Sequence, residues 1–205
     1  MLFVFVLGVI LIVWSTWGFV SSRVEQAEYS VIKKADGYEV RRYPARIVAE
    51  TKIPGLGNQA LIDGFRIVAR YIFGANTKDV KIAMTAPVMA TSERGFAPEK
   101  SFTATFVEGE TIVAFGIPKD IVPESLPFPV DPRVTIVTRP ETVYAALRFG
   151  GLRGDATIKA KEKILAEKLA RDGVKIVGAP IYAGYNAPWT PFWMTRHEVL
   201  IPIEA

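Results

Sequence analysis

Residues 86–90, Ala-Pro-Val-Met-Ala, return later in the chain as residues 179–183, Ala-Pro-Ile-Tyr-Ala. An earlier pair matches in the same way, because residues 43–49, Tyr-Pro-Ala-Arg-Ile-Val-Ala, resemble residues 139–145, Arg-Pro-Glu-Thr-Val-Tyr-Ala. The prolines of the two motifs are 43 residues apart in the first copy and 40 apart in the second. Two matches in the same order and at similar spacing predict a duplicated unit of about 95 residues.

Each predicted half contains one helix between its two prolines. In the first half, Asn58 is a candidate N-cap and Gly74 a candidate C-cap. In the second half, Asp155 is the candidate N-cap and Gly173 the candidate C-cap. Apolar side chains repeat at helical spacing in both segments. They are Leu61, Phe65, Val68 and Ile72 in the first, and Ile158, Leu165 and Leu169 in the second.

The remaining periodic segments have the alternation of strands. The predicted strands are 38–42, 46–53, 80–91, 101–107, 111–115, 133–138, 142–149, 175–185 and 196–203. Each half is therefore strands, one helix and strands again. We predict an α+β fold, in which an antiparallel, barrel-like sheet built from two pseudo-repeats carries two flanking helices.

The first 22 residues carry no charged side chain, and residues 2–20 read LFVFVLGVILIVWSTWGFV. As a helix, these 19 residues would span about 28 Å, close to the thickness of a bilayer core. We therefore predict a single-pass transmembrane anchor over residues 1–22 and one domain over residues 23–205. A cleaved signal peptide, giving a secreted or periplasmic protein, and a buried core helix are the alternatives. The side of the membrane on which the domain lies is left open.

The composition of the rest excludes several classes of site. The chain has no cysteine, which excludes disulfides, thiolate catalysis, iron–sulfur clusters and covalently attached haem. It has one histidine, His197, so histidine clusters for a metal are excluded. The net charge of +4 is small and scattered, and we expect no nucleic-acid partner.

Five phrases, in order, carry a resemblance to a known family. They are YEVRRY at 38–43, YIFGAN at 71–76, KIAMTAPV at 81–88, YNAPWT at 185–190 and RHEV at 196–199. This set resembles the SOUL haem-binding proteins, and the resemblance covers about residues 28–204. It implies a barrel-like α+β fold of two pseudo-repeats that binds haem or other tetrapyrroles reversibly in an apolar groove beside a helix.

The resemblance places the tetrapyrrole between the first helix and the loop near the C-terminus. A porphyrin needs apolar side chains for its ring and basic side chains for its propionates. The implied binding residues on the helix are Ile62, Phe65, Arg66, Ala69 and Arg70, and those on the loop are Trp189, Phe192 and Trp193.

Each of these residues also has a structural interpretation. Phe65 suits a core position, Arg66 and Arg70 suit a solvated helix face, and the aromatic loop suits packing on the barrel or contact with a membrane interface. His197 is a weak candidate for an axial ligand, since many relatives carry Asn at its place and its neighbours Arg196 and Glu198 are expected to be exposed. Met84, Thr85 and Pro87 are interpreted as structural.

The predicted function is non-catalytic, membrane-anchored binding of haem or a related tetrapyrrole, as a carrier, buffer or sensor. The sequence offers no acid–base pair beside a haem, so an enzyme is not expected. The alternative is a module on the same fold that binds a protein or a lipid-like ligand and has no physiological haem.

Overall fold

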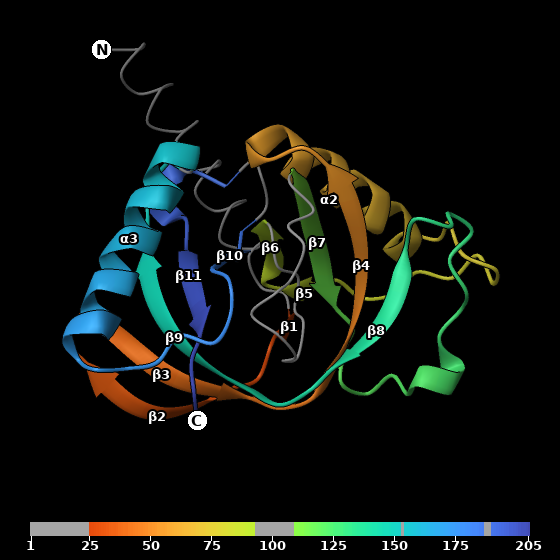
Figure 1. Ribbon diagram of the computed structural model, residues 1–205. Coiled ribbons are helices and arrows are strands. Elements are labelled where there is room, and N and C mark those ends of the chain that lie inside the picture. The colour runs from red at the N-terminus through yellow and green to blue at the C-terminus, as the bar shows by residue number, and fades with distance from the viewer. Residues whose placement is uncertain (1–24, 93–108, 153, 187–189) are drawn as a thin grey trace, which may run out of the picture.

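The computed structural model describes residues 25–92, 109–152, 154–186 and 190–205 (Figure 1). The strands are β1 (Glu25–Gln26), β2 (Ser30–Ala35), β3 (Tyr38–Tyr43), β4 (Arg46–Pro54), β5 (Thr85–Ala86), β6 (Val88–Ser92), β7 (Glu110–Gly116), β8 (Thr135–Arg139), β9 (Thr142–Phe149), β10 (Ile181–Gly184) and β11 (His197–Pro202). The helices are α2 (Gly57–Ile72) and α3 (Asp155–Arg171), with short 3₁₀ turns η1 (Pro123–Ser125) and η2 (Phe192–Met194).

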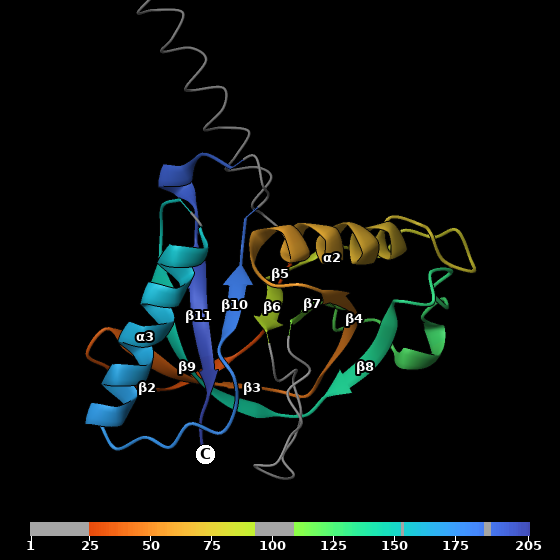
Figure 2. The same ribbon diagram turned by 45° about the horizontal axis from the view of Figure 1, so that its top comes forward.

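Nine of these strands form one antiparallel sheet in the order β2-β3-β9-β11-β10-β6-β7-β4-β8. The sheet curls around the two helices as a half-barrel (Figures 1 and 2). Its centre has a two-fold pattern, because β6 pairs with β10 so that Val88 faces Gly184 and Ile181 faces Thr91. Outward from that pair, β7 and β4 on one side match β11 and β9 on the other. The predicted α+β fold is confirmed, and this order agrees with the predicted duplication.

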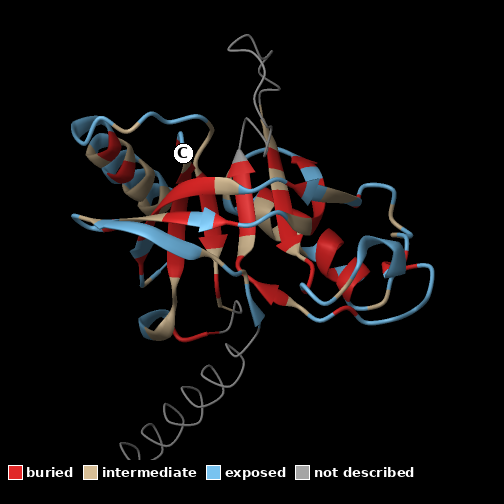
Figure 3. Ribbon diagram, turned by 90° about the horizontal axis from the view of Figure 1, so that it is seen from below, coloured by how far each residue is buried: buried red, intermediate tan, exposed pale blue. Residues whose placement is uncertain are grey.

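Alternation along the strands separates an inner apolar layer from an outer one. On β9, Val143, Ala145 and Leu147 belong to the large core under the helices, while Tyr144 and Ala146 belong to a smaller cluster on the outer face. Ala27 and Tyr29 pack against that outer cluster. Buried residues fill the middle of the sheet, and the edge strand and the loops are exposed (Figure 3).

Helix α2 lies very close to the sheet at Gly64. A Cβ atom at this position would lie 2.5 Å from Cγ2 of Val113 on β7, so only glycine fits without a shift. Ile67, Val68 and Ile72 are buried on the same side of the helix. The predicted apolar stripe is thus confirmed at Val68 and Ile72, with a buried face wider than the stripe.

Both predicted N-caps are wrong by one or two residues. Helix α2 begins at Gly57, with Leu56 as its N-cap and no side-chain cap. Helix α3 begins at Asp155, with Gly154 as its N-cap. The carboxylate of Asp155 lies against Gly57, where a Cβ atom would be 2.5 Å from Oδ2. The first turns of the two helices therefore meet, and a negative charge lies near the N-terminus of α2, where the helix dipole favours it.

Two predicted strands are shorter in the structure than predicted, and a third lies outside the described residues. Residues 80–84 are irregular, because the backbone N–H of Ile82 donates to the carbonyl of Ile72 at the end of α2. Of the predicted strand 175–185, only residues 181–184 form a continuous strand, after Pro180, which has no N–H to donate, and Ile176 makes an isolated bridge to Ile203. The predicted strand 101–107 lies outside the described residues.

The predicted transmembrane helix also lies outside the described residues. Within the residues that the structure describes, no helix is long and apolar enough to cross a bilayer.

Candidate functional site

The five helix residues predicted to bind a ligand form one stripe along α2. Their spacing of three and four residues places them on one side of the helix. Ile62 and Phe65 are half-buried, Ala69 is buried, and Arg66 and Arg70 are exposed. The ring of Phe65 also packs on Phe115 of β7, with centroids 5.2 Å apart. Burial therefore changes across the stripe, from apolar side chains that are buried or half-buried to two arginines that are exposed to solvent.

Among the described residues, neither arginine of this α2 stripe has a strong ion pair. Nη1 of Arg66 lies 3.6 Å from Asp63, and both side chains are exposed, so the pair is worth little. Arg70 lies close enough to Asp131 for its positive charge to help lower the pKa of that carboxyl, mainly held down by Arg133, to about 2. Both guanidinium groups can therefore turn toward a carboxylate at low cost.

The C-terminal end of the stripe meets an exposed apolar loop. Phe128 and Val130 are 77% and 66% exposed. Backbone hydrogen bonds join Thr77 to Phe128 and Val130 to Ala75, which fixes this loop beside the end of α2. No ligand contact was predicted for this loop, although its two bulky apolar side chains among prolines were an available signal.

Phe192 and Trp193 of the predicted loop lie elsewhere. They belong to η2, which lies beside the first turn of α3 in Figures 1 and 2. Thr195 ties this turn to Gly151 by two hydrogen bonds, of 2.9 and 3.1 Å. Both aromatic rings are half exposed. Trp189 lies outside the described residues. The structure thus groups the α2 residues together and places Phe192 and Trp193 near α3.

His197 is buried on the inner face of β11. Its Nδ1 lies 2.8 Å from the hydroxyl of Tyr182 on β10. The ring of Phe149 packs against it, with centroids 5.5 Å apart. In this position the imidazole is part of the packed interior.

A cavity of about 260 Å³ lies between the first turns of α2 and α3. Leu61 and Ile158 of the helices line it, with Ala90, Thr111 and Tyr182 of the sheet below. Pockets for drug-sized ligands have about 300–1,000 Å³. As it stands, this cavity is too small for a tetrapyrrole.

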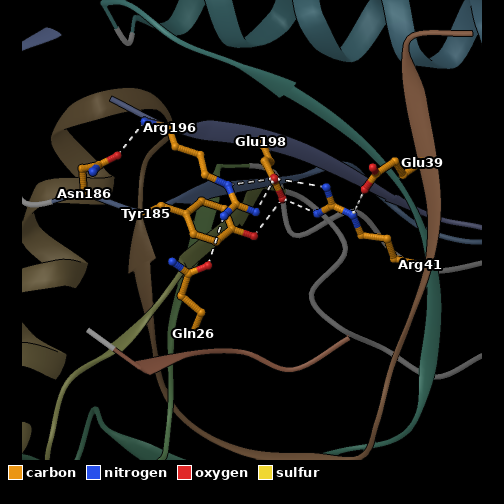
Figure 4. A network of polar contacts seen from close by, with 7 residues as sticks. All are labelled: Gln26, Glu39, Arg41, Tyr185, Asn186, Arg196 and Glu198. Carbon is orange, nitrogen blue, oxygen red and sulfur yellow. Dashed lines mark hydrogen bonds and ion pairs between the residues drawn. The ribbon is translucent and has the colours of Figure 1, made fainter. Parts of the chain in front are cut away.

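The outer face of the sheet carries a buried polar network that sequence reasoning missed (Figure 4). The carboxylate of Glu198 on β11 is fully buried and accepts hydrogen bonds from Arg41 at 2.7 and 3.3 Å, from Arg196 at 2.8 and 3.1 Å, and from the Tyr185 hydroxyl at 2.8 Å. Arg41 also donates to Glu39 at 2.8 Å. The expectation that Arg196 and Glu198 are exposed is wrong, because these charged groups lie on the outer face beneath the segment 25–29.

This network shifts the titration of its members. Burial alone would raise the pKa of Glu198, but hydrogen bonds and charge from Arg41, with further hydrogen bonds from Arg196 and Tyr185, lower it below its ordinary value. The pKa of Tyr185 is raised by burial, by the charge of Tyr43 and by the charge of Glu198. Glu198 is thus held as an anion between two cations, which is a structural arrangement.

Three of the five family phrases contribute residues to this network, and the other two make structural hydrogen bonds elsewhere. Arg41 comes from YEVRRY, Tyr185 from YNAPWT, and Glu198 from RHEV. Asn76 of YIFGAN is buried, and its side chain donates to the carbonyls of Tyr71 and Val80 to shape the turn after α2. Thr85 of KIAMTAPV donates to the carbonyl of Gly116, which is consistent with a structural role for that phrase.

Comparison with known proteins agrees with these phrases. A family model described as SOUL heme-binding protein matches residues 24–202. Heme-binding protein 2 of Homo sapiens is 32% identical over 154 residues, which cover 74% of this chain and 71% of the human protein. Heme-binding protein 2 of Mus musculus is 31% identical over 156 residues, with the same coverage.

Among solved structures, the fold is similar to the C-terminal domain of EcmrR, with a TM-score of 0.61 and 10% identity over 86% of this chain and 98% of that one. A hydrolase from Listeria innocua has a TM-score of 0.54 and 8% identity, over 84% of this chain and 94% of that one. At these identities, the likeness shows a shared fold and nothing about a ligand.

Proposed function

This chain belongs to the SOUL heme-binding protein family, and we propose that it binds haem or a related tetrapyrrole reversibly and without catalysis, along the α2 stripe. One observation carries the placement. The stripe joins half-buried Ile62 and Phe65 to the exposed guanidinium groups of Arg66 and Arg70. This is the combination that a flat apolar ring with two propionates requires.

The exposed loop at Phe128 and Val130 extends the apolar surface beyond the stripe. The ring would rest on Ile62 and Phe65, and the propionates would meet Arg66 and Arg70. Because His197 lies in the interior, the affinity would come from burial of the ring and from the two charge-assisted contacts. Such an arrangement favours release and suits a carrier or a buffer.

A haemin titration tests this proposal on the full-length protein in lipid nanodiscs, with empty nanodiscs as the control for partition into lipid. We expect a saturable change of the Soret band with a Kd of roughly 1 μM, about −8 kcal/mol. A titration that stays identical to that of empty nanodiscs up to roughly a hundredfold higher concentration contradicts haem binding. It would favour the alternative, a protein- or lipid-interaction module without haem.

We further propose that residues 2–20 anchor the domain to a membrane as a single span. The support is a run of bilayer length without any charged side chain. The full-length protein should remain with membranes after high-salt and carbonate washing and should keep its N-terminal residues. A soluble mature form that begins between about residues 20 and 28 would show a cleaved signal peptide instead.

A further inference from the structure

Four large apolar side chains lie exposed at one end of the domain. Leu152 is 74% exposed, and Leu56, Phe192 and Trp193 are each 50% exposed. We call these four residues the apolar rim. Single exposed apolar residues are ordinary on a protein surface, whereas a gathered set marks a contact with another apolar body.

The apolar rim is held together by defined contacts. Thr195 hydrogen bonds to Gly151, which fixes η2 against the turn that carries Leu152. The carboxylate of Asp155 lies against Gly57, which brings the turn of Leu56 to the first turn of α3. Figure 2 shows the first turns of α2 and α3 and the η2 turn at the same end of the molecule.

The chain enters the domain at this same end. Gln26 pairs with Ala86, just before β6 begins, and Val88 at the start of β6 faces Gly184 at the end of β10. Gly184 in turn faces His197 at the start of β11. The side chain of Gln26 accepts a hydrogen bond of 3.0 Å from Arg196, three residues after Trp193. Glu25 and Gln26 therefore lie at the end of the central strands where η2 precedes β11.

Chain length then limits where a membrane can be. Four residues lie between Val20, the end of the apolar run, and Glu25, and the five residue-to-residue steps span at most about 18 Å when fully extended. If residues 2–20 span a bilayer, the bilayer surface lies within that distance of Glu25. The end of the domain that bears the apolar rim is then the end next to the lipid.

We propose that the apolar rim docks into the interfacial layer of the bilayer that residues 2–20 enter. This proposal rests on the anchor proposed above and adds an orientation of the domain. Tryptophan and other aromatic side chains favour this layer because one end of the ring is apolar and the other accepts water. The charge beside the rim is mixed, because Asp155 and Lys159 line the same cavity as Leu56, so the contact depends on apolar burial rather than on anionic lipid.

Tryptophan quenching by brominated lipid tests the docking in the full-length protein. In a variant with Trp14→Phe, Trp17→Phe and Trp189→Phe, Trp193 is the only tryptophan left. In phosphatidylcholine vesicles brominated near the glycerol end of the acyl chain, we expect Trp193 to lose roughly half of its emission, as an interfacial residue would. Unchanged emission in vesicles that retain the protein after carbonate washing overturns the docking and leaves the anchor in place.

A matched control removes Trp193 as well, by Trp193→Phe, and introduces Phe128→Trp. Phe128 is also an exposed aromatic, but it lies at the opposite end of α2, and its emission should not change. Equal quenching at both positions would show general contact with lipid and would overturn docking by the rim. Loss of the protein from washed vesicles overturns both the anchor and the docking. A rim covered by a second copy of the chain leaves Trp193 unquenched and gives a dimer by cross-linking, which also overturns the proposal.

Discussion

The two faces of the sheet use arginine in opposite ways. On the outer face, Arg41 is buried, and its guanidinium is bound to Glu198 at 2.7 Å and to Glu39 at 2.8 Å. On the inner side, Arg66 and Arg70 are exposed on α2, and within the described part of the chain Arg66 has only a weak ion pair with Asp63. A guanidinium that is already bound holds the fold together, whereas one that faces solvent beside an apolar stripe is available to a ligand. The difference separates a structural network from a candidate binding surface.

The largest expected effect comes from breaking the outer network. Glu198→Gln removes the buried carboxylate that Arg41 and Arg196 share, and it leaves the buried guanidinium of Arg41 with only the partly exposed Glu39 to balance its charge. We expect a loss of about 3–5 kcal/mol in the free energy of unfolding, measured by urea denaturation.

Glu39→Gln is the matched control, because Glu39 also binds Arg41 but its side chain is 30% exposed. Its loss should stay below about 1 kcal/mol. Equal losses in the two variants would show that burial of Glu198 is not what makes the network matter.

The same carboxylate predicts a dependence on pH. The pKa of Glu198 in the folded protein lies below its ordinary value of 4.5, so the ionised form stabilises the fold above that value. This contribution is lost as the pH falls from about 4.5 through the lowered pKa. The unfolding free energy of the wild type should therefore fall more steeply below pH 4.5 than that of Glu198→Gln. Parallel curves for the two proteins would assign acid destabilisation to other groups.

A smaller effect is expected on the inner side. Arg70→Ala removes a charge-assisted contact worth about 1.5–3 kcal/mol, less a reduction for exposure, so haemin affinity should fall roughly three- to thirtyfold. Arg66→Ala should act in the same direction, and neither change should lower the unfolding free energy by more than about 0.5 kcal/mol.

The control for these two changes is Arg42→Ala, which removes the same charge from an exposed position on β3. Haemin affinity should not change in this variant. If Arg42→Ala weakens binding as much as Arg70→Ala does, haemin is attracted by the overall positive charge of the protein and does not bind specifically at the α2 stripe.

The smallest effect on haemin is expected at the only histidine. Since His197 is buried and hydrogen bonded to Tyr182, His197→Gln should change the affinity less than about threefold, or about 0.65 kcal/mol. The Soret maximum of bound haemin should stay where it is in the wild type. A strong shift of that maximum, in a variant shown by circular dichroism to be folded, would mean that the iron is ligated by His197 after rearrangement.

The sequence predicted the parts of the fold that local patterns encode. Strand β9 matches its predicted bounds, 142–149, because proline marks its start and apolar residues alternate along it. Strand β2 was missed because Val31-Ile32-Lys33-Lys34 does not alternate. At the edge of the sheet, both faces of this strand are largely exposed, so no buried face imposes alternation. The duplication was visible because both proline motifs survive in the two halves.

The candidate site was predictable only in part. Helical spacing brought Ile62, Phe65 and Arg66 onto one side of α2, which required no knowledge of the rest of the chain. The pairing of Arg41 with Glu198 joins residues 157 apart, and nothing in the local pattern around either residue announces it. Glu198 was predicted to be exposed for the same reason: its burial depends on packing against residues far away in the sequence.

Amide hydrogen exchange, measured with and without haemin on the full-length protein in nanodiscs, tests the central claim most directly, because it locates the ligand without any substitution. A ligand that rests on α2 suppresses local opening of that helix and slows exchange there. We predict added protection in peptides that cover residues 62–72 and none in peptides that cover β3 and β11. Protection confined to β3 and β11, or to the first turns of α2 and α3 around the cavity, would contradict a tetrapyrrole site on the α2 stripe.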